Sequence, residues 1–345
     1  MQALTLSGTT GIGALGVQDV PAPALRETSD VRIRVHAASI NRLDVMLTDG
    51  LPGVTLSFPH IVGTDAAGVV ESVGADVQEL HPGDRVMVNP GISCGHCESC
   101  LAGEQPLCSH FGILGEHRPG TAAEFIVVPA SNVARVPDDM GWAEAAAFSL
   151  ATLTAWRMLV TRAQLRAGET VLVWGAGGGL AQAAIAISRL AGASVIAAST
   201  SDAKLDIARR LGADHVVNHT TADLAAVVKR ITGRRGADVV VDSVGEASWP
   251  RSLRCLARGG RLVTCGATTG PMVGLDIRKL FWHQWSILGS TMGSHREYAA
   301  VTALAALGKL WPVVDRVVPL AESVNVYRRM AANEQTGKLV IEVTT

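Results

Sequence analysis

Apolar residues change their spacing twice between residues 170 and 204. A short apolar run at residues 171–175 ends in glycine, and the apolar positions that follow, from Leu180 to Leu190, recur at helical spacing. A second short apolar run occupies residues 194–198. A strand, a helix and a second strand within about 30 residues form the unit that requires a parallel sheet.

The same alternation continues through the middle of the chain. Further strand-like runs lie at residues 215–218, 237–242, 260–266 and 286–289, with helical patterns at 203–211 and 224–231 between them. Together with the first two runs this makes six strands, the number found in a complete doubly wound fold.

The first 140 residues or so are patterned differently. Residues 31–35 alternate between apolar and polar positions, and residues 66–73 and 84–88 are short β-branched runs, so this region is predicted to be rich in β-strand. A helical pattern at residues 142–162 leads into the parallel sheet. Strand-like segments return at residues 313–319 and 339–343 and are expected to rejoin the first domain.

The chain is therefore α/β with two predicted domains. A β-rich domain comprises residues 1–152 and 294–345 and is discontinuous, and residues 153–293 form the parallel-sheet domain. Each is long enough to bury its own core.

Glycines at 175, 177, 178 and 179 form the turn between the first parallel strand and its helix. A turn without Cβ atoms lets a pyrophosphate approach the backbone, and the following helix directs unsatisfied N–H groups at the anion. A purely steric turn would use glycine as well. The surrounding six-strand pattern favours a dinucleotide site.

The end of the second parallel strand, about 20 residues beyond the glycines, indicates which dinucleotide binds. Enzymes that use NAD carry an acidic residue there for the ribose 2′-OH. This chain instead has Ser199, Thr200 and Ser201, with Lys204 shortly after. NADP(H) is therefore favoured over NAD(H). The alternative is that Ser201 caps the next helix and Lys204 is a solvated side chain.

Composition narrows the class of partner. The net charge is −1, which excludes the concentrated positive field of a nucleic-acid or anionic-membrane partner and favours a small-molecule substrate. Mean hydropathy is +0.27, but no apolar run reaches 18 residues, so no membrane span is expected. The N-terminus lacks a basic segment before an apolar one, which indicates a cytoplasmic, reducing location.

Four cysteines lie close together in a glycine-containing loop, at positions 94, 97, 100 and 108. Adjacent Cys-x-x-Cys pairs favour metal over disulfides in a reducing compartment. We therefore expect Cys94, Cys97, Cys100 and Cys108 to bind one structural Zn²⁺ per chain in a lobe at about residues 90–112. His96 and His110 are expected to be bystanders, since four thiolates already complete a zinc site.

Several segments together resemble the medium-chain dehydrogenase/reductase superfamily. They are PHIVGTDAAGVV (59–70), HPGDRV (81–86), the four-cysteine loop, the glycine turn, ADVVVDSVG (237–245), GGRLVTCG (259–266) and TGKLVIEV (336–343). The resemblance covers essentially the whole chain. It implies a GroES-like catalytic domain joined to a Rossmann domain. It also implies a homodimer or homotetramer, in which the strand at residues 286–289 lies at the edge of the Rossmann sheet and pairs with its counterpart in a second subunit.

The sequence departs from the zinc alcohol dehydrogenases at each position that matches a ligand of their catalytic zinc. Asn41 takes the place of a cysteine, Thr64 that of a histidine, and Leu150 that of the third ligand. An amide, a hydroxyl and an alkyl group do not form a Zn²⁺ site, so no catalytic zinc is expected. Asn41 and Asp44 are similar to the Asn-x-x-Asp of the quinone oxidoreductase branch.

The predicted function is hydride transfer from NADPH to a quinone-like or α,β-unsaturated carbonyl acceptor, with Asn41, Asp44 and Thr64 as candidate catalytic residues. Asn41 could also simply close a turn. The candidate cofactor-binding residues are Thr154, Gly175, Gly177, Gly178, Gly179, Leu180, Ser199, Ser201, Lys204, Gly266 and Lys338. The resemblance implies that Thr154 lies beside the nicotinamide and Lys338 on the pyrophosphate.

Two alternatives remain open. One is a zinc-dependent alcohol dehydrogenase with atypical ligands, for example Asp44, His60 and Asp65. The other is a non-catalytic NADP(H)-binding sensor or structural protein, since a fold does not determine a function.

Overall fold

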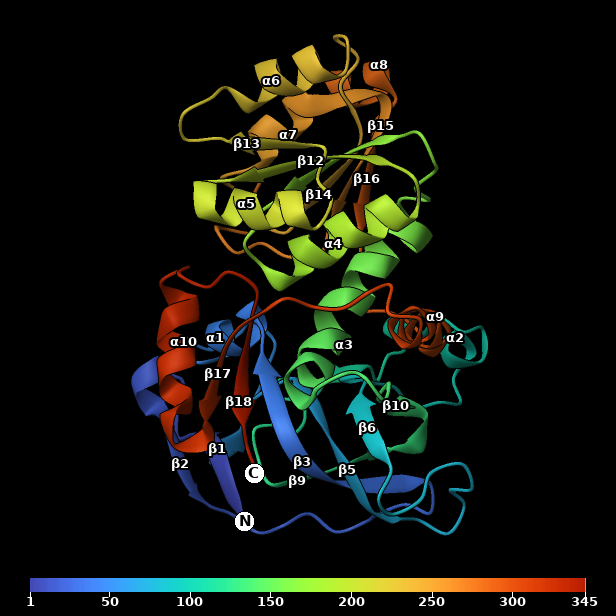
Figure 1. Cartoon of the computed structure of the whole chain (residues 1–345), viewed down its shortest axis with the longest axis vertical. Helices are drawn as coiled ribbons and strands as arrows, with labels where there is room; N and C mark the ends of the chain where they lie inside the picture. The colour runs from blue at the N-terminus through green and yellow to red at the C-terminus, as the bar shows by residue number, and fades with distance from the viewer. Residues whose placement is uncertain (345) are drawn as a thin grey trace. The chain divides into compact units, whose positions relative to one another are not determined.

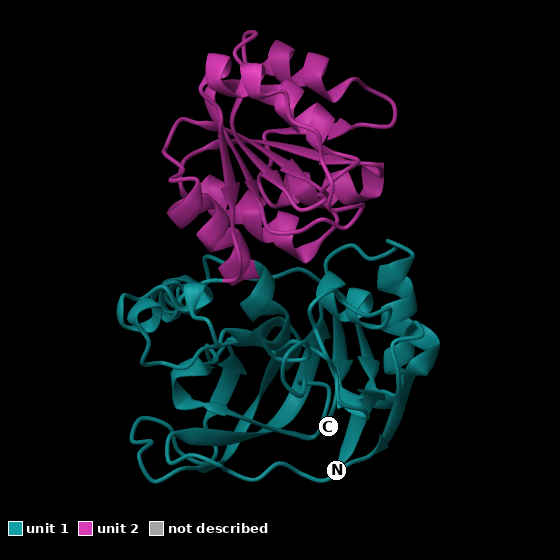
Figure 2. Cartoon of the chain, turned by 180° about the vertical axis from the view of Figure 1, so that it is seen from behind, with its two compact units in different colours: residues 1–151, 293–345 teal, residues 152–292 magenta. Residues whose placement is uncertain are grey.

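The computed structural model describes residues 1–344 and divides the chain into two compact units. Unit 1 comprises Met1–Ala151 and Gly293–Thr345, and unit 2 comprises Thr152–Met292 (Figure 2). The domain boundaries expected from the sequence lie one residue from these divisions. The first unit is discontinuous because the end of the chain returns to it.

Unit 2 is built on one parallel sheet of six strands (Figure 1). The strands are β11 (Thr170–Trp174), β12 (Ser194–Ser199), β13 (His215–Asn218), β14 (Ala237–Asp242), β15 (Leu256–Thr264) and β16 (Ser286–Gly289). Their order across the sheet is β13-β12-β11-β14-β15-β16, which confirms the doubly wound topology. All five residues of β11 are buried, as expected for a central strand covered on both faces.

Helices connect these strands. They are α4 (Gly179–Leu190), α5 (Asp202–Arg210), α6 (Leu224–Ile231), α7 (Trp249–Cys255) and α8 (Ile277–His283). The helix predicted at residues 142–162 consists of α3 (Trp142–Trp156) and a π-helical continuation, Arg157–Arg162. One hydrophobic cluster of this unit includes Leu172, Val240 and Leu262 from neighbouring strands and Val228 from α6.

Unit 1 is dominated by a seven-stranded sheet. Its strands are β3 (Asp30–Ile40), β5 (Asp65–Val73), β6 (Arg85–Val88), β9 (Phe125–Pro129), β10 (Val133–Arg135), β17 (Val314–Pro319) and β18 (Lys338–Glu342). The order is β10-β6-β5-β3-β18-β17, with β9 also paired to β3. The antiparallel pairing of β18 with β3 confirms that the last strands rejoin the first domain.

Shorter elements complete unit 1. The strands are β1 (Gln2–Leu6), β2 (Leu15–Asp19), β4 (His60–Ile61), β7 (Gly91–Ile92) and β8 (Gly112–Ile113), and the helices are α1 (Arg42–Leu47), α2 (Glu98–Leu101), α9 (His295–Ala306) and α10 (Ser323–Ala331). Single 3-10 turns lie at Ile12–Ala14, Gln105–Leu107, Ala130–Asn132 and Leu320–Glu322. None of the helices in residues 1–344 has the length and apolar character required to cross a membrane.

Candidate active site

A buried polar network lies where three neighbouring strands of unit 1 bring distant parts of the chain together. Asp65 begins β5, Asn41 follows the last residue of β3, and Lys338 begins β18. In the strand register Ser39 is opposite Asp65, and Ile40 is opposite Leu339. The side chains of Asn41, Asp65 and Lys338 are therefore neighbours although 297 residues separate Asn41 from Lys338.

The Lys338 ammonium donates to Asn41 Oδ1 at 2.5 Å and to Asp65 Oδ2 at 2.9 Å. Asn41 Nδ2 donates to the same carboxylate oxygen at 2.9 Å. Lys338 is 3% exposed and Asp65 is fully buried. A buried charge pair of this kind is stable only when hydrogen bonds satisfy the remaining polar atoms, as they do for Asp65 here.

Thr64 and Asp44 extend the network toward α1. Asn41 Nδ2 donates to Thr64 Oγ1 at 2.6 Å, and Thr64 Oγ1 donates to Asp44 Oδ2 at 2.9 Å. Asp44 Oδ2 also accepts the backbone N–H of Asn41 at 2.6 Å, which satisfies a free amide at the start of α1. Burial raises the pKa of Asp44 to about 7, although hydrogen bonds from Asn41 and Thr64 and the charge of Lys338 oppose the rise.

The positions that match the catalytic-zinc ligands of alcohol dehydrogenases all meet at Asp65. Asn41 donates to Asp65 Oδ2 and also bonds Thr64, while the backbone N–H of Leu150 donates to Asp65 Oδ1 at 2.8 Å. Their side chains supply an amide, a hydroxyl and an alkyl group, and the ammonium of Lys338 already lies beside the amide oxygen. This donor set does not fit Zn²⁺.

The alternative ligand set of Asp44, His60 and Asp65 is wrong. His60 Nε2 lies 2.9 Å from the backbone oxygen of Gly115. Within residues 1–344 the only group of three or more potential metal-binding side chains that converge is the four-cysteine cluster.

Three of the candidate residues have neighbours that lie far away in the sequence. The Lys338 ammonium bonds Asn41 and Asp65 in the interior of unit 1. Both Nδ2 hydrogens of Asn41 have acceptors, in Thr64 and Asp65. Thr154 is 5% exposed, and its hydroxyl lies 3.8 Å from Met292 Sδ. A local motif cannot reveal these partners because they lie far away in the sequence.

The glycine turn of unit 2 has the backbone geometry that an anion site requires. Gly175 has a φ of +72° and open space where a Cβ would lie. Gly178 is the N-cap of α4, and a Cβ there would meet only the carbonyl oxygen of Gly175 at 3.5 Å. Gly179 and Leu180 form the first turn of α4. At Gly175 and Gly178 the turn therefore carries no side chain that would hold a phosphate away from the first turn of α4, while the N–H groups of Gly175, Ala176 and Gly178 donate to backbone carbonyls.

The residues proposed to select the cofactor lie at the end of β12. Ser199 is the last residue of β12, and its hydroxyl accepts the backbone N–H of Ser201 at 3.4 Å. Ser201 occupies the N-cap position of α5, but its hydroxyl makes no capping bond. The aliphatic carbons of Lys204 lie against Gly177, where an added Cβ would be 2.3 Å from Lys204 Cδ. Lys204 thus lies along the glycine turn. Gly266 follows β15 and packs near Ser243.

The four cysteines converge as predicted. Cys94 Sγ lies 3.5 Å from Cys108 Sγ and 3.9 Å from Cys100 Sγ, and all four sulfur atoms lie within 4.8 Å of one another. Four sulfurs at about 2.3 Å from a tetrahedral zinc would be about 3.8 Å apart, whereas a disulfide would bring two to about 2.05 Å. Backbone amides of His96 and Cys97 lower the pKa of Cys94 to about 6, which favours its thiolate. The cluster fits zinc.

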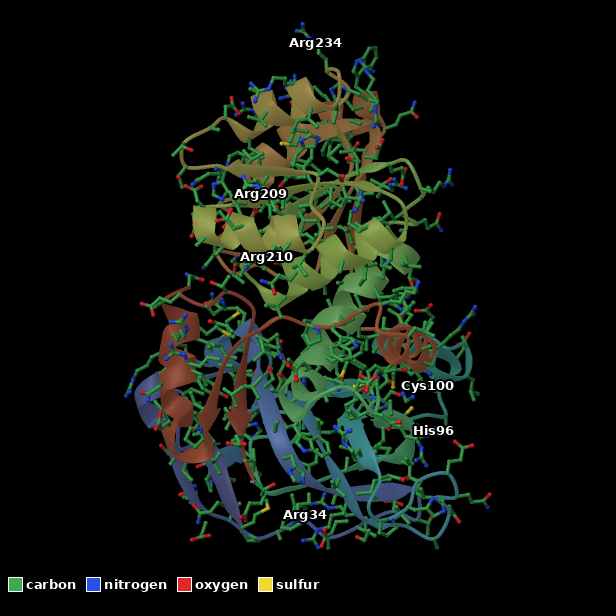
Figure 3. All side chains as sticks on the ribbon, in the orientation of Figure 1. Arg34, His96, Cys100, Arg209, Arg210 and Arg234 are labelled. Carbon is green, nitrogen blue, oxygen red and sulfur yellow. The ribbon has the colours of Figure 1, made fainter. Side chains whose placement is uncertain are left out.

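His96 and His110 of the lobe, and the cysteines at 255 and 265 in unit 2, lie outside this cluster. His96 Nδ1 is 2.8 Å from the backbone oxygen of Cys94, and His110 Nδ1 is 3.2 Å from Ser109 Oγ. Figure 3 labels Cys100 and His96 in this lobe. In unit 2, burial raises the pKa of both Cys255 and Cys265 to about 12, so neither is an activated nucleophile.

Comparison with known proteins identifies the family. Residues 27–138 match the alcohol dehydrogenase GroES-like domain, and residues 179–306 match the zinc-binding dehydrogenase family. An L-threonine 3-dehydrogenase of Anaeromyxobacter sp. (strain Fw109-5) is 34% identical over 94% of this chain and 95% of its own. A crotonyl-CoA carboxylase/reductase of Cereibacter sphaeroides is 30% identical over 96% of this chain and 84% of its own.

A solved structure of an NAD-dependent alcohol dehydrogenase superposes with a TM-score of 0.96 and 43% identity, covering all of both chains. The chain therefore belongs to the medium-chain dehydrogenase/reductase superfamily and is an NAD(P)-dependent oxidoreductase. This confirms the GroES-like and Rossmann architecture expected from the sequence. The family and the cysteine cluster together support binding of both zinc and NAD(P).

The cysteine cluster predicts the metal content of the purified protein. We expect one zinc per chain by elemental analysis, and none in Cys97→Ser, because removal of one thiolate opens a closed four-ligand site. Cys255→Ala, which removes a thiol outside the cluster, should keep its zinc. Two zinc ions per wild-type chain would contradict a single structural site.

The buried Asp44 predicts a pH dependence of stability. Its pKa of about 7 exceeds the value of about 3.9 in an unfolded chain, so the folded protein holds this proton more tightly between those pH values. Its contribution to stability is therefore complete below about pH 4 and declines as the pH rises to 7, by up to about 1.4 kcal/mol per pH unit. Asp44→Asn, which has no such proton, should lose this component.

Urea unfolding of wild type and Asp44→Asn at several pH values between 4.5 and 7.5 measures this component. The stability of the variant relative to wild type should increase with pH. Asp19→Asn is the control, because the Asp19 side chain is 81% exposed and its variant should show no such trend. A pH-independent difference for Asp44→Asn would contradict the prediction.

Proposed function

We propose that this protein is an NADPH-dependent reductase of quinone-like or α,β-unsaturated carbonyl acceptors, and that it transfers hydride without a catalytic zinc. The observation that carries the proposal is the position of the Lys338 ammonium, bonded to Asn41 and Asp65 where the zinc-ligand positions of the sequence meet. A divalent cation at the same oxygens would meet a fixed positive charge at short range. The zinc of the cysteine lobe is then structural.

The missing Lewis acid decides which reaction is accessible. Alcohol oxidation needs an alkoxide to donate hydride, and zinc normally stabilises that alkoxide. Reduction of an activated double bond has no such requirement. NADPH, when bound at the glycine turn, would supply the hydride that forms a C–H bond at the β-carbon of the acceptor. The electron pair of the double bond moves onto the carbonyl oxygen, and the resulting enolate takes a proton from solvent, leaving a saturated carbonyl compound and NADP⁺.

The relatives support two classes of reaction. The name of the crotonyl-CoA carboxylase/reductase refers to an α,β-unsaturated thioester, which belongs to the acceptor class proposed here. Other relatives are named for the oxidation of alcohols or threonine, so alcohol dehydrogenation is the second candidate. The preference for NADPH over NADH is supported by this chain's own sequence, in which β12 ends at Ser199 without a carboxylate. A protein that binds NADP(H) without turnover is the third possibility.

Stopped-flow fluorescence tests the reaction. The wild-type protein with one zinc per chain should oxidise bound NADPH when a quinone or an enone is added. Its kcat/KM should be at least about tenfold higher with NADPH than with NADH, since a phosphate gains charge-assisted hydrogen bonds worth about 1.5–3 kcal/mol.

The control variant is Gly178→Val, whose side chain would project where the pyrophosphate approaches and should abolish nucleotide binding in a folded protein. NADPH binding without turnover on any acceptor would favour the sensor hypothesis. Alcohol oxidation that depends on a second zinc would favour the dehydrogenase.

We also propose that the protein is a homodimer or homotetramer that associates through the edge of the Rossmann sheet. Strand β16 lies at that edge, and α8, which precedes it, exposes Phe281 and Trp282 at 63% and 67%. Trp285 turns inward instead, and its Nε1 donates to the backbone oxygen of Ala257 at 2.9 Å. Large exposed aromatic side chains beside the outer edge of an edge strand favour an interface.

Analytical ultracentrifugation at micromolar concentration tests the interface. The wild type should sediment as a dimer or tetramer, and Phe281→Glu with Trp282→Glu should dissociate it. Leu307→Glu changes an equally exposed side chain at the end of α9, where Leu307 is 69% exposed, and should leave the mass unchanged. A monomeric wild type would contradict the proposal.

A further inference from the structure

The carboxyl edge of the parallel sheet carries a positioned cation, the guanidinium of Arg251. Strands β11, β12 and β13 end at Trp174, Ser199 and Asn218, and because the strands are parallel these ends share one edge. His219 follows β13, and its backbone N–H donates to the carbonyl oxygen of Ser199 at 3.1 Å. Ligands of doubly wound sheets bind outside this edge.

Arg251 lies over this edge from the first turn of α7. Its guanidinium carbon is 4.9 Å from the centre of the Trp174 ring, and Nη1 is 3.2 Å from His219 Nδ1. Nη2 also donates to the backbone oxygen of Ala247 at 3.3 Å. An aromatic face, an imidazole and a carbonyl group therefore hold the guanidinium in one place.

These partners leave the charge of Arg251 uncompensated. Burial and the nearby charge of Arg251 lower the pKa of His219 below its ordinary value, so at neutral pH the imidazole is neutral and Nδ1 can accept the arginine N–H. Throughout residues 1–344, no carboxylate lies within ion-pair distance of Arg251. Arg254 of the same helix, by contrast, pairs with Asp223 at 3.0 Å.

Two carboxylates near this edge, those of Asp242 and Asp202, are bonded to other groups. Asp242, the last residue of β14, accepts the hydroxyls of Ser248 and Ser252 and so fixes the start of α7. Asp202 accepts from Asn218 Nδ2 at 2.9 Å. A positioned cation without a counter-ion, on the edge where a nucleotide binds, is suited to an anionic group of that nucleotide.

We propose that Arg251 contacts the 2′-phosphate of NADP(H) and that His219 is the residue that positions it. This inference rests on the NADP(H) preference proposed above and adds a determinant that the pattern at the end of β12 does not contain. Ser199 marks the ribose end of the site, and the backbone bond from His219 to Ser199 places the arginine beside it. Lys204, which lies along Gly177, is nearer the turn that faces the pyrophosphate.

Titration calorimetry with two nucleotides isolates this contact without any turnover. Adenosine 2′,5′-bisphosphate carries the 2′-phosphate, and adenosine 5′-monophosphate lacks it. Arg251→Gln should weaken binding of the bisphosphate by about tenfold or more and leave the monophosphate within about twofold. Arg254→Gln removes the same charge from the same helix and should change neither.

The role of His219 is tested by measuring how its variants change the preference for adenosine 2′,5′-bisphosphate over adenosine 5′-monophosphate. His219→Ala should reduce the preference for the bisphosphate, because the guanidinium loses the acceptor that orients it, while His219→Asn, which restores an acceptor oxygen, should recover most of it. If Arg251→Gln does not fold, Arg251→Lys keeps the charge without the planar fork and should lose the preference in part.

The outcomes separate this inference from the proposed function. An unchanged preference in Arg251→Gln would overturn the inference alone. So would an equal loss for both nucleotides, which would place Arg251 against the adenine ring instead. A wild type that binds both nucleotides equally would refute the NADP(H) preference and this inference with it.

Discussion

The buried ion pair between Lys338 and Asp65 depends on a strand pairing that joins the two ends of the chain. Strand β18 lies antiparallel to β3, with Leu339 opposite Ile40, and β3 in turn pairs with β5. This order places the first residues of β18 and β5 on either side of Asn41. A register shift by one residue would turn Lys338 to the other face of the sheet and leave the Asp65 carboxylate buried without its cation.

The energetic consequence is that the network constrains the fold as well as the chemistry. Removing one partner of a buried ion pair typically costs about 3–5 kcal/mol, because the other charge then lies unpaired in the interior. Asp65 accepts hydrogen bonds from Asn41 and Leu150 in addition to the lysine, so it links β3, β5, β18 and α3. Asp44 Oδ1 and the hydroxyl of Tyr327 are the buried polar atoms in and beside this network that lack a partner among the described residues.

The two units differ in how they hold a positively charged side chain. In unit 1 the cation of Lys338 is neutralised internally and shielded from solvent, so its effect is to occupy a position and orient neighbouring groups. In unit 2 Arg251 is held by neutral groups, which leaves its charge available to a ligand. Gly175 and Gly178 add to that contrast, because the absence of side chains there lets an anion approach the N-terminus of α4.

The sequence by itself determined the architecture and the metal lobe. The spacing of apolar residues predicted all six strands of the parallel sheet, because the central strands are continuous apolar runs and the edge strands β13 and β16 are still short apolar segments between helical patterns. The four cysteines were predictable for a similar reason, since their short spacings bring the sulfurs together within one loop. The residue types at Asn41, Thr64 and Leu150, which are not zinc ligands, could also be read directly from the sequence.

The partners of the polar side chains were decided only by the tertiary structure. The Lys338 ammonium lies in the interior beside Asn41, because its position is set by the pairing of β18 with a strand almost 300 residues earlier. The amide hydrogens of Asn41 are bound by Thr64 and Asp65, which the Asn-x-x-Asp motif does not reveal. Arg251 and His219 come from separate elements that have no common motif. They meet at one edge only when the parallel sheet has formed, because hydrogen bonds between distant residues depend on strand order and register.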